Sequence, residues 1–362
     1  MSANYDLSNL ALKAVCPNNE ILYDDKGKPS IMVKIPKMSY AELGLGSSTA
    51  IHPAFIVNGQ EVDAIYISKY QNIVMDGRAY SLPGEDPKAS INFDNALAAC
   101  TAKGAGWHLM SRAEWAMLAL WCKKNGTQPK GNNNYGKDTA DSIYQAIPSM
   151  ARDSSNRIQR VATGTGPLSW SHDGTPSGIW DLNGNVNEWV GGLRTVYGEL
   201  QILANNNAAD SGNSQAANSA QWMAIKADDG TLITPNGDGR TTGSIKLSWE
   251  SSAWKFIIGT PAEDTTYHGC TLESVTCSED IGDAAKLLLQ ALGLFKYDAT
   301  AGAYNGDYLY AYVTQEERAF YCGGSWDYGA NAGVFFSRGN NARSGAGNDV
   351  GFRSAFVNLP TA

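Results

Sequence analysis

The segment that decides the fold runs from Tyr321 to Phe356 and reads YCGGSWDYGANAGVFFSRGNNARSGAGNDVGFRSAF. Glycine recurs throughout it. A residue without a Cβ adopts positive φ at little steric cost, which favours turns and close backbone approach over helix. No apolar stripe with the 3.6-residue period of a helix is present. The segment therefore predicts an irregular scaffold at the protein surface, and this scaffold is a candidate binding surface.

Two kinds of side chain stand between these glycines. The first kind is spaced as if to anchor the backbone, and we call these residues the framework: Trp326, Asn340, Asn341, Arg343, Phe352 and Arg353. The second kind is a scatter of unrelated chemistries: Asp327, Tyr328, Phe336, Arg338 and Asp349. Large aromatic side chains lose little rotamer entropy on binding, so Tyr328 and Phe336 are candidates for ligand contact. The alternative for Phe336 is that it is simply buried.

The motifs GGSW, GANAGVF, NNARS and GFRSAF resemble the C-terminal segment of variable proteins of diversity-generating retroelements, which use a C-type lectin fold. In that family a reverse transcriptase rewrites the adenines of asparagine codons. The resemblance implies that the diversified, ligand-binding positions are Asp327, Tyr328, Phe336, Arg338, Gly345, Gly347, Asn348 and Asp349. Asp, Tyr, Phe, Arg and Gly can each arise from an asparagine codon by changes at its adenines.

Upstream motifs extend the resemblance. HLMSRAEW and IWDLNGNVNEWV are similar to sequences of sulfatase-modifying-factor domains, the class of the formylglycine-generating enzyme, although Asn187 stands where that family usually has Trp. The resemblance covers residues 31–194 and 321–357. It implies an α+β protein with a C-type lectin fold of the formylglycine-generating-enzyme type, containing two helices, twisted antiparallel sheets and much irregular loop. We predict an N-terminal arm (1–29), a lectin-like domain (30–194 and 321–362) and an insertion within it (195–320).

Local patterns predict several elements. IMVKIP (31–36) alternates as a strand, and residues 55–68 are typical of a hairpin, with Asn58-Gly59 as its turn. A helix is expected over 93–103, and a second begins at Ser111, which forms a capping box with Glu114. Within the insertion, 204–220 is expected to be a mobile loop and 278–292 a helix. The arm is expected to be irregular.

Composition limits the classes of function. Hydrophobic residues make up 43% and charged residues 18% of the 362 residues, which indicates a globular chain. The net charge of -8 argues against a nucleic-acid partner. No signal peptide and no apolar window of membrane-spanning length is visible, so membrane insertion is not expected. The six cysteines do not form a dense disulfide framework, and a bridge between Cys270 and Cys277 stays open.

Catalysis is not expected. The formylglycine-generating enzymes depend on a pair of cysteines within the segment that corresponds to Trp326–Phe352, whose thiolates bind copper, and this chain has no cysteine after Cys322. His172-Asp173 lies in SHDGT, which is more typical of a turn than of a catalytic pair. No HxxxH, HExxH or CxxC spacing supports zinc. An oxidase of this class remains the enzymatic alternative.

Calcium is the one metal with a sequence argument, and no other cofactor is expected. In related folds the loop that corresponds to GNVNEW can bind Ca²⁺ through oxygen ligands, which makes Asn183, Asn185 and Glu188 the candidates. The alternative is an Asn-rich turn in which Glu188 pairs with a framework arginine. The Glu-Pro-Asn and Gln-Pro-Asp triplets of sugar-binding lectins are absent from the sequence, so a lectin fold here does not imply sugar binding.

These observations lead to one functional hypothesis and one structural alternative. We predict a non-enzymatic protein that displays a diversified site on a rigid fold and binds a protein or glycan receptor on a target cell surface. The resemblance implies a tail-associated phage protein made in the bacterial cytoplasm, or else a bacterial surface protein. A homo-oligomer would add avidity. The alternative is a structural virion protein whose variable-looking segment packs against a neighbour.

Overall fold

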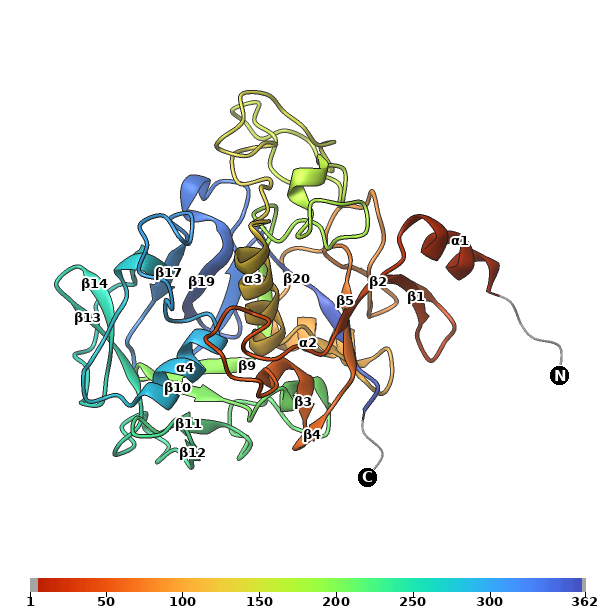
Figure 1. Ribbon diagram of the computed structural model, residues 1–362. Helices are drawn as coiled ribbons and strands as arrows, with labels where there is room; N and C mark the ends of the chain where they lie inside the picture. Colours follow the sequence, from red (N-terminus) through yellow and green to blue (C-terminus); the bar gives the residue numbers. More distant parts are fainter. Residues whose placement is uncertain (1–5, 360–362) are drawn as a thin grey trace.

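The computed structural model describes residues 6–359, which form a mixed α+β protein (Figure 1). A five-stranded sheet and a twelve-stranded sheet make up most of it, together with two short hairpins. The described residues contain four α-helices: α1 (Leu7–Val15), α2 (Phe93–Thr101), α3 (Arg112–Asn125) and α4 (Asp283–Ala291). The resemblance implied two helices. The other two come from the N-terminal arm and from the predicted insertion.

The five-stranded sheet is antiparallel throughout and joins both ends of the chain. Its strands, in spatial order, are β1 (Asn19–Tyr23), β2 (Pro29–Pro36), β5 (Ala64–Ser68), β21 (Ser354–Phe356) and β8 (Trp107–Leu109). The strand predicted over 31–36 is confirmed as part of β2. Residues 1–5 of the predicted arm lie outside the described residues. Residues 6–29 are not irregular, because they contain α1 and β1, and β1 pairs with β2 along its whole length.

The twelve-stranded sheet carries the C-terminal segment at its centre. Its main path is β15 (His268–Thr271), β17 (Tyr308–Ala311), β19 (Gly333–Asn341), β18 (Glu317–Gly323), β9 (Asn187–Val196), β10 (Glu199–Ile202), β13 (Lys246–Glu250), β14 (Ala253–Ile257) and β16 (Thr276–Cys277). Three strands lie off this path: β11 (Met223–Ile225), β12 (Leu232–Ile233) and β20 (Val350–Phe352). Most pairings in this sheet are antiparallel, as expected, but β17 pairs parallel with β19, β20 with β9 and β14 with β16.

The first of the two short hairpins contains the turn predicted at Asn58-Gly59. β3 (Ile56–Val57) and β4 (Gln60–Glu61) are joined by Asn58 and Gly59, whose φ values of 51° and 78° are both positive, as a type I′ turn requires. The hairpin ends there, since β5 joins the five-stranded sheet instead. The second hairpin pairs β6 (Ile73–Met75) with β7 (Arg78–Tyr80).

Helix α3 is the central helix and packs under the twelve-stranded sheet (Figure 1). The predicted capping box is present, with Ser111 and Glu114 each bonded to the other's backbone, and Gly126 ends the helix in the left-handed conformation. The Trp115 indole N–H donates to the Val334 carbonyl of β19 at 2.8 Å. The Arg112 guanidinium donates to the Ser337 hydroxyl at 2.7 Å. These contacts fix β19 from its inner side.

Residues 204–220, expected to be a mobile loop, are instead held against the core. Asn206 is fully buried, and its amide donates to Glu114 Oε1 at 3.0 Å while its side-chain oxygen accepts from the Ser111 hydroxyl at 2.6 Å. Gln215 is also buried, and its side-chain oxygen accepts from the Gly192 amide at 2.8 Å. Polar side chains anchor this loop where apolar area is scarce.

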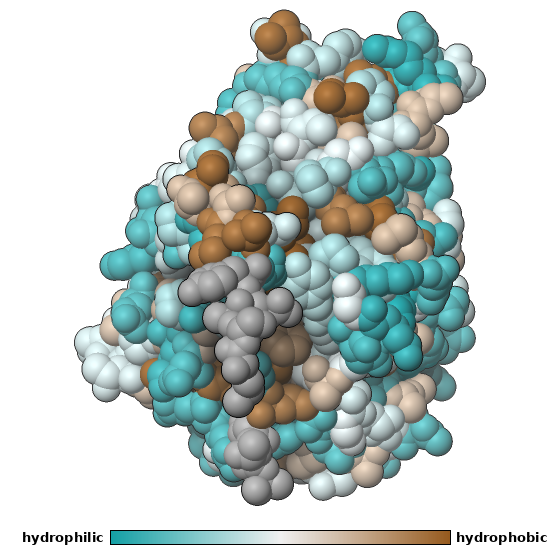
Figure 2. All heavy atoms as spheres, turned by 90° about the vertical axis from the view of Figure 1, so that its right-hand side faces the viewer, coloured by the Kyte–Doolittle hydropathy of each residue, from teal (hydrophilic) through white to brown (hydrophobic). Residues whose placement is uncertain are grey.

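The surface is mixed in character. On the side that carries α1, hydrophobic residues lie in small groups among hydrophilic ones (Figure 2). Leu7 and Val15 of α1 are each 74% exposed. No helix among residues 6–359 is both long enough and apolar enough to cross a membrane.

Candidate binding surface

The strand pairing of β17, β19 and β18 aligns a row of side chains across the sheet. Tyr310 of β17 is paired with Arg338 of β19, and Arg338 is paired with Tyr321 of β18. Directly paired residues point to the same side of a sheet, and so do residues two apart along one strand. Phe336 and Tyr308 therefore share this side with Arg338 and Tyr310. We call this side the outer face.

The opposite, inner face belongs to the protein core. Phe335 and Cys322 are buried there in the main hydrophobic cluster, and Ser337 is buried against Arg112 of α3. The two faces of β19 thus alternate residue by residue. The inner face is filled by α3, and the outer face carries the residues of unrelated chemistry.

Arg338 lies at the centre of the outer face. Its guanidinium carbon is 5.0 Å from the ring centre of Tyr267, 5.5 Å from that of Tyr310 and 5.6 Å from that of Tyr328. The guanidinium donates to the Tyr328 hydroxyl through Nη1 and to Asn340 Oδ1 through Nε, the latter at 2.6 Å. Within residues 6–359 no carboxylate oxygen comes within ion-pair distance of it. Cation–π contacts hold this cation in place of an ion pair.

Aromatic rings pack around this cation at varied angles. The Tyr328 and Phe336 ring centres are 5.1 Å apart at 73°, and those of Tyr308 and Tyr310 are 5.3 Å apart and stacked. Tyr310 lies directly over Gly269 of β15, because a Cβ at Gly269 would come within 2.3 Å of the Tyr310 ring. A glycine is therefore needed beneath Tyr310.

Phe336 is buried, which was the alternative to a role in ligand contact. It has no exposed surface and packs with Trp189, Tyr321 and Phe352. A side chain in this position supports the outer face from beneath and cannot itself contact a ligand in this conformation. The expectation that Phe336 is an exposed contact is wrong, because Tyr328 and Tyr310 cover its ring.

The other predicted diversified residues lie in the two turns that flank β19. Asp327 is exposed, and one of its oxygens accepts from the Ser325 hydroxyl at 2.8 Å. Gly347 and Asn348 are exposed, and Gly345 is half-buried, in the turn between β19 and β20. The Asn348 carbonyl accepts from Arg160 at 3.0 Å.

Asp349 connects this turn to the first residue of β9. Its Oδ2 accepts from the Asn187 amide at 3.1 Å, so Asn187, the residue that departs from the family pattern, holds a predicted diversified position. Burial raises the pKa of the Asp349 carboxyl, and the nearby charge of Asp327 raises it further, whereas Arg338 lowers it. The Asp349 carboxyl therefore interacts with the charges of both Asp327 and Arg338.

Four of the six framework residues are tied into the protein. Trp326 packs with Val186 and Ala89, and Phe352 is fully buried. Arg343 makes a bidentate ion pair with Glu317 at 2.7 and 2.9 Å and also reaches Asp94 of α2. Arg353 is described below.

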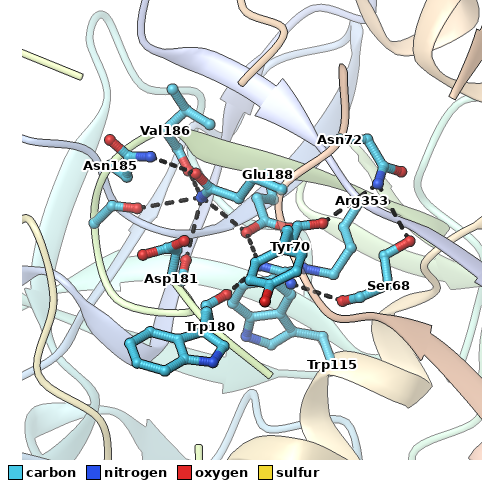
Figure 3. Close-up of polar contacts among 12 residues, drawn as sticks. Ser68, Tyr70, Asn72, Trp115, Trp180, Asp181, Asn185, Val186, Glu188 and Arg353 are labelled. Carbon is cyan, nitrogen blue, oxygen red and sulfur yellow. Dashed lines mark hydrogen bonds and ion pairs between the residues drawn. The ribbon is translucent and has the colours of Figure 1, made fainter. Parts of the chain in front are cut away.

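Arg353 is fully buried, and each of its three side-chain nitrogens has a hydrogen-bond acceptor (Figure 3). Its guanidinium forms two hydrogen bonds to the Glu188 carboxylate, at 2.8 and 2.9 Å. It also donates to the carbonyls of Ser68 and Trp180, each at 2.8 Å. This arginine joins β5, β9 and the segment around Trp180 that precedes β9.

Asn340 and Asn341 depart from the framework pattern. Both are half-buried at the end of β19, and Asn340 Oδ1 accepts from Arg338 and from Asn341. Asn340 orients the Arg338 guanidinium and shares the outer face with it, and Asn341 in turn donates to Asn340.

The residues suggested for calcium do not fit that ion. The side-chain oxygen of Asn185 accepts from the Val161 amide at 2.9 Å and from Asn132 at 3.1 Å. That of Asn183 accepts from Asn133 at 3.2 Å. Both Glu188 oxygens are engaged by Arg353 (Figure 3). Because donors from the protein itself occupy these oxygens, the loop is an Asn-rich turn in which Glu188 pairs with a framework arginine, which was the alternative to a calcium site.

The cysteines are free thiols in this structure, including Cys270 and Cys277. Cys322 is the nearest to the outer face in sequence, yet it is buried on the inner face, where it accepts a hydrogen bond from Arg112. Burial raises the pKa of its thiol. Within residues 6–359 there is no group of three or more His, Cys, Asp or Glu side chains that could hold a metal ion.

Sequence reasoning missed the part of the outer face that comes from the predicted insertion. Tyr267, Tyr308 and Tyr310 all lie within residues 195–320. Tyr267 and Tyr310 lie beside Arg338, and Tyr308 stacks on Tyr310. The signal was the alternation in YLYAY (308–312), where every second residue is tyrosine and the residues between are buried. Such alternation is typical of a strand with one covered face.

Comparison with known proteins gives structural matches only. No family model and no curated protein matches the chain. The solved structures that match include a variable protein, the class that the C-terminal motifs resemble. It is Treponema denticola variable protein 1, with 13% identity over 94% of this chain and 99% of that chain and a TM-score of 0.33.

Two further structures match over similar lengths. The Major Tropism Determinant P3c variant is 11% identical over 94% of this chain and 71% of its own, with a TM-score of 0.33. PvdO from Pseudomonas aeruginosa is 13% identical over 93% of this chain and 97% of its own, with a TM-score of 0.30.

Proposed function

We propose that this chain is a ligand-binding protein whose binding site is the outer face, and that it is a variable protein of a diversity-generating retroelement. The observation that carries the proposal is the division of the C-terminal segment. Tyr328 and Arg338, which the motif resemblance marks as diversified, meet on the half-exposed outer face. Arg353 and Phe352, which it marks as framework, are fully buried.

This division suits a protein that must change its ligand without losing its fold. The backbone of β19 is fixed by β17, β18 and α3, so a ligand does not need to order a loop when it binds. Side chains above that backbone can then be exchanged at little cost to the core. A few central residues would carry most of the affinity, at about 2 kcal/mol or more each.

The domain arrangement belongs to the same proposal. Residues 30–194 and 321–362 would form the lectin-like domain, with 195–320 inserted in it. The inserted strands β15 and β17 extend the central sheet beside β19, so the insertion would take part in binding as well as in structure.

The proposed function also implies a binding partner and a location for this protein. We infer a receptor on a target cell surface, bound by a tail-associated phage protein or by a bacterial surface protein. The oxidase alternative has less support, because the thiol nearest in sequence to the outer face, that of Cys322, faces the core.

Sequencing the native locus and its close relatives tests the proposal. We expect a near-copy of the codons for residues 321–356 beside a reverse-transcriptase gene, with differences at adenines of the codons for Asp327, Tyr328, Arg338, Gly345, Gly347, Asn348 and Asp349. The codons for Arg343, Phe352 and Arg353 should not differ. A locus without such a repeat, with all these codons fixed, would contradict the assignment and would favour the structural virion protein.

A further inference from the structure

The Arg338 guanidinium is a half-buried cation that lacks a counter-ion within residues 6–359. Other arginines at this end of the sheet differ. Arg343 pairs with Glu317 at 2.7 Å, Arg194 with the same carboxylate at 2.9 Å and Arg353 with Glu188 at 2.8 Å. A charge removed from water gains from an opposite charge brought close to it. Arg338 can therefore gain such a partner from a ligand.

The hydroxyl groups around Arg338 also have hydrogens to donate. The Tyr328 hydroxyl accepts from Arg338 Nη1, and the Tyr310 hydroxyl accepts from the Asn331 amide at 3.2 Å. A hydroxyl that accepts still carries one hydrogen. In the described part of the chain neither hydroxyl donates that hydrogen to an acceptor. In the described part of the chain, Arg338 Nη2 and these two O–H groups thus have hydrogens without an acceptor.

A carboxylate matches this set of donors. Its two oxygens can accept from a guanidinium and a hydroxyl at once, and its charge pairs with that of the arginine. A doubly charged phosphate fits less well, because the Asp349 carboxyl lies close enough to Arg338 to interact with its charge. A single negative charge meets less repulsion from this carboxyl.

The rings favour a protein as the source of the carboxylate. Tyr328 stands at 74° to Tyr310 and at 73° to Phe336, so the outer face offers ring edges and faces in several directions. Tyrosine-rich surfaces of this kind bind irregular protein surfaces, because each ring supplies both apolar area and a polar tip.

We infer that Arg338, with the Tyr328 and Tyr310 hydroxyls, binds the carboxylate of an acidic side chain on a protein partner. This inference rests on the proposed function and names the chemistry that the outer face selects in this particular chain. Tyr267, 46% exposed, would flank the acidic side chain.

Selection of a random twelve-residue peptide library displayed on phage tests the inference. The wild-type protein is compared with Arg338→Gln and with the control Arg318→Gln. Arg318 lies on the neighbouring strand β18, 5.0 Å from the Tyr312 ring, but it already pairs with Glu316 at 2.8 Å. Thermal unfolding of each variant checks that it is folded.

We expect peptides enriched on the wild-type protein to carry Asp or Glu at a recurrent position. Individual peptides should bind Arg338→Gln roughly tenfold more weakly than the wild-type protein. Replacing the Asp or Glu of a peptide by Asn or Gln should weaken its binding to the wild-type protein by the same factor. Arg318→Gln should select and bind like the wild type.

Three results would overturn the inference: no excess of acidic residues among the enriched peptides, no peptide enriched at all, or equal binding by folded Arg338→Gln. Binding of sialylated but not neutral glycans on an array, without selection of acidic peptides, would overturn the protein source in favour of a sugar acid. The proposed function falls by a different result, the absence of a repeat at the locus, so the two failures are distinguishable.

Discussion

Arg338 and Arg353 lie fifteen positions apart in one segment and have opposite environments. Arg353 is fully buried, and each of its three nitrogens donates to a carboxylate or a carbonyl. Arg338 is half-exposed, is surrounded by tyrosine rings and has no ion-pair partner in the part of the chain that the structure describes. The first arginine can be justified by the fold alone. The second has unused binding capacity, which is what a binding site requires.

Removing the buried arginine should have the largest effect on stability. Arg353→Met keeps much of the volume but leaves the Glu188 carboxylate buried without its cation. We expect the free energy of unfolding to fall by about 3 to 5 kcal/mol. Urea denaturation measures it, with Arg338→Met as the matched control, which should change by less than about 1 kcal/mol. Similar losses for both variants would remove the contrast between the two arginines.

Phe336 tests whether the outer face has a fixed layer beneath it. Phe336→Ala should destabilise the protein by about 3 to 5 kcal/mol, because a fully buried ring is lost and leaves a cavity. Phe336→Leu should cost less, since part of the volume is kept. Tyr328→Ala, which removes a ring from above it, should cost much less than Phe336→Ala in the same denaturation experiment. A mild effect of Phe336→Ala would mean that this position is as replaceable as the motif resemblance implied.

Asp181 lies beside the Arg353–Glu188 pair and should give the interior a characteristic pH dependence. Burial raises the pKa of its carboxyl to about 6, from an ordinary value of 3.8. Between pH 4 and 6 the folded state keeps a proton that the unfolded state has released, so stability falls as pH rises through this window and is level above it. The shift corresponds to about 3 kcal/mol.

Unfolding free energies at several pH values between 4 and 8 measure this effect. Asp181→Asn should remove the part of the pH dependence that Asp181 causes. If Asp181→Asn keeps the wild-type slope, the carboxyl of Asp181 is ionised in the fold at pH 5 and the prediction is wrong.

The elements that the sequence predicted are those with local signals. The capping box of Ser111 and Glu114 and the positive-φ pair Asn58-Gly59 depend on residues close together in the chain, and both are confirmed. Strand β1 was missed because it is a strand through its pairing with β2 and not through the pattern of its own residues. The arm was therefore expected to be irregular.

The outer face could be predicted only in part for the same reason. Tyr328 and Arg338 stand in one motif, but Tyr310 reaches them through the parallel pairing of β17 with β19. Phe335 and Phe336 are adjacent, and both are buried because both faces of β19 are covered at that point. Nothing in the pair FF distinguishes a covered outer position from an exposed one.

The most direct test is a mutational scan in which each residue from 321 to 356 is replaced by every other amino acid. The variants are displayed on the surface of yeast cells, and resistance to protease measures the folded fraction of each variant. We predict broad tolerance at 327, 328, 338 and 345–349, and intolerance at Phe336, Phe352 and Arg353. Equal tolerance at Arg353 and Arg338, or intolerance at Tyr328 and Arg338, would contradict the division into a fixed interior and an exchangeable binding face.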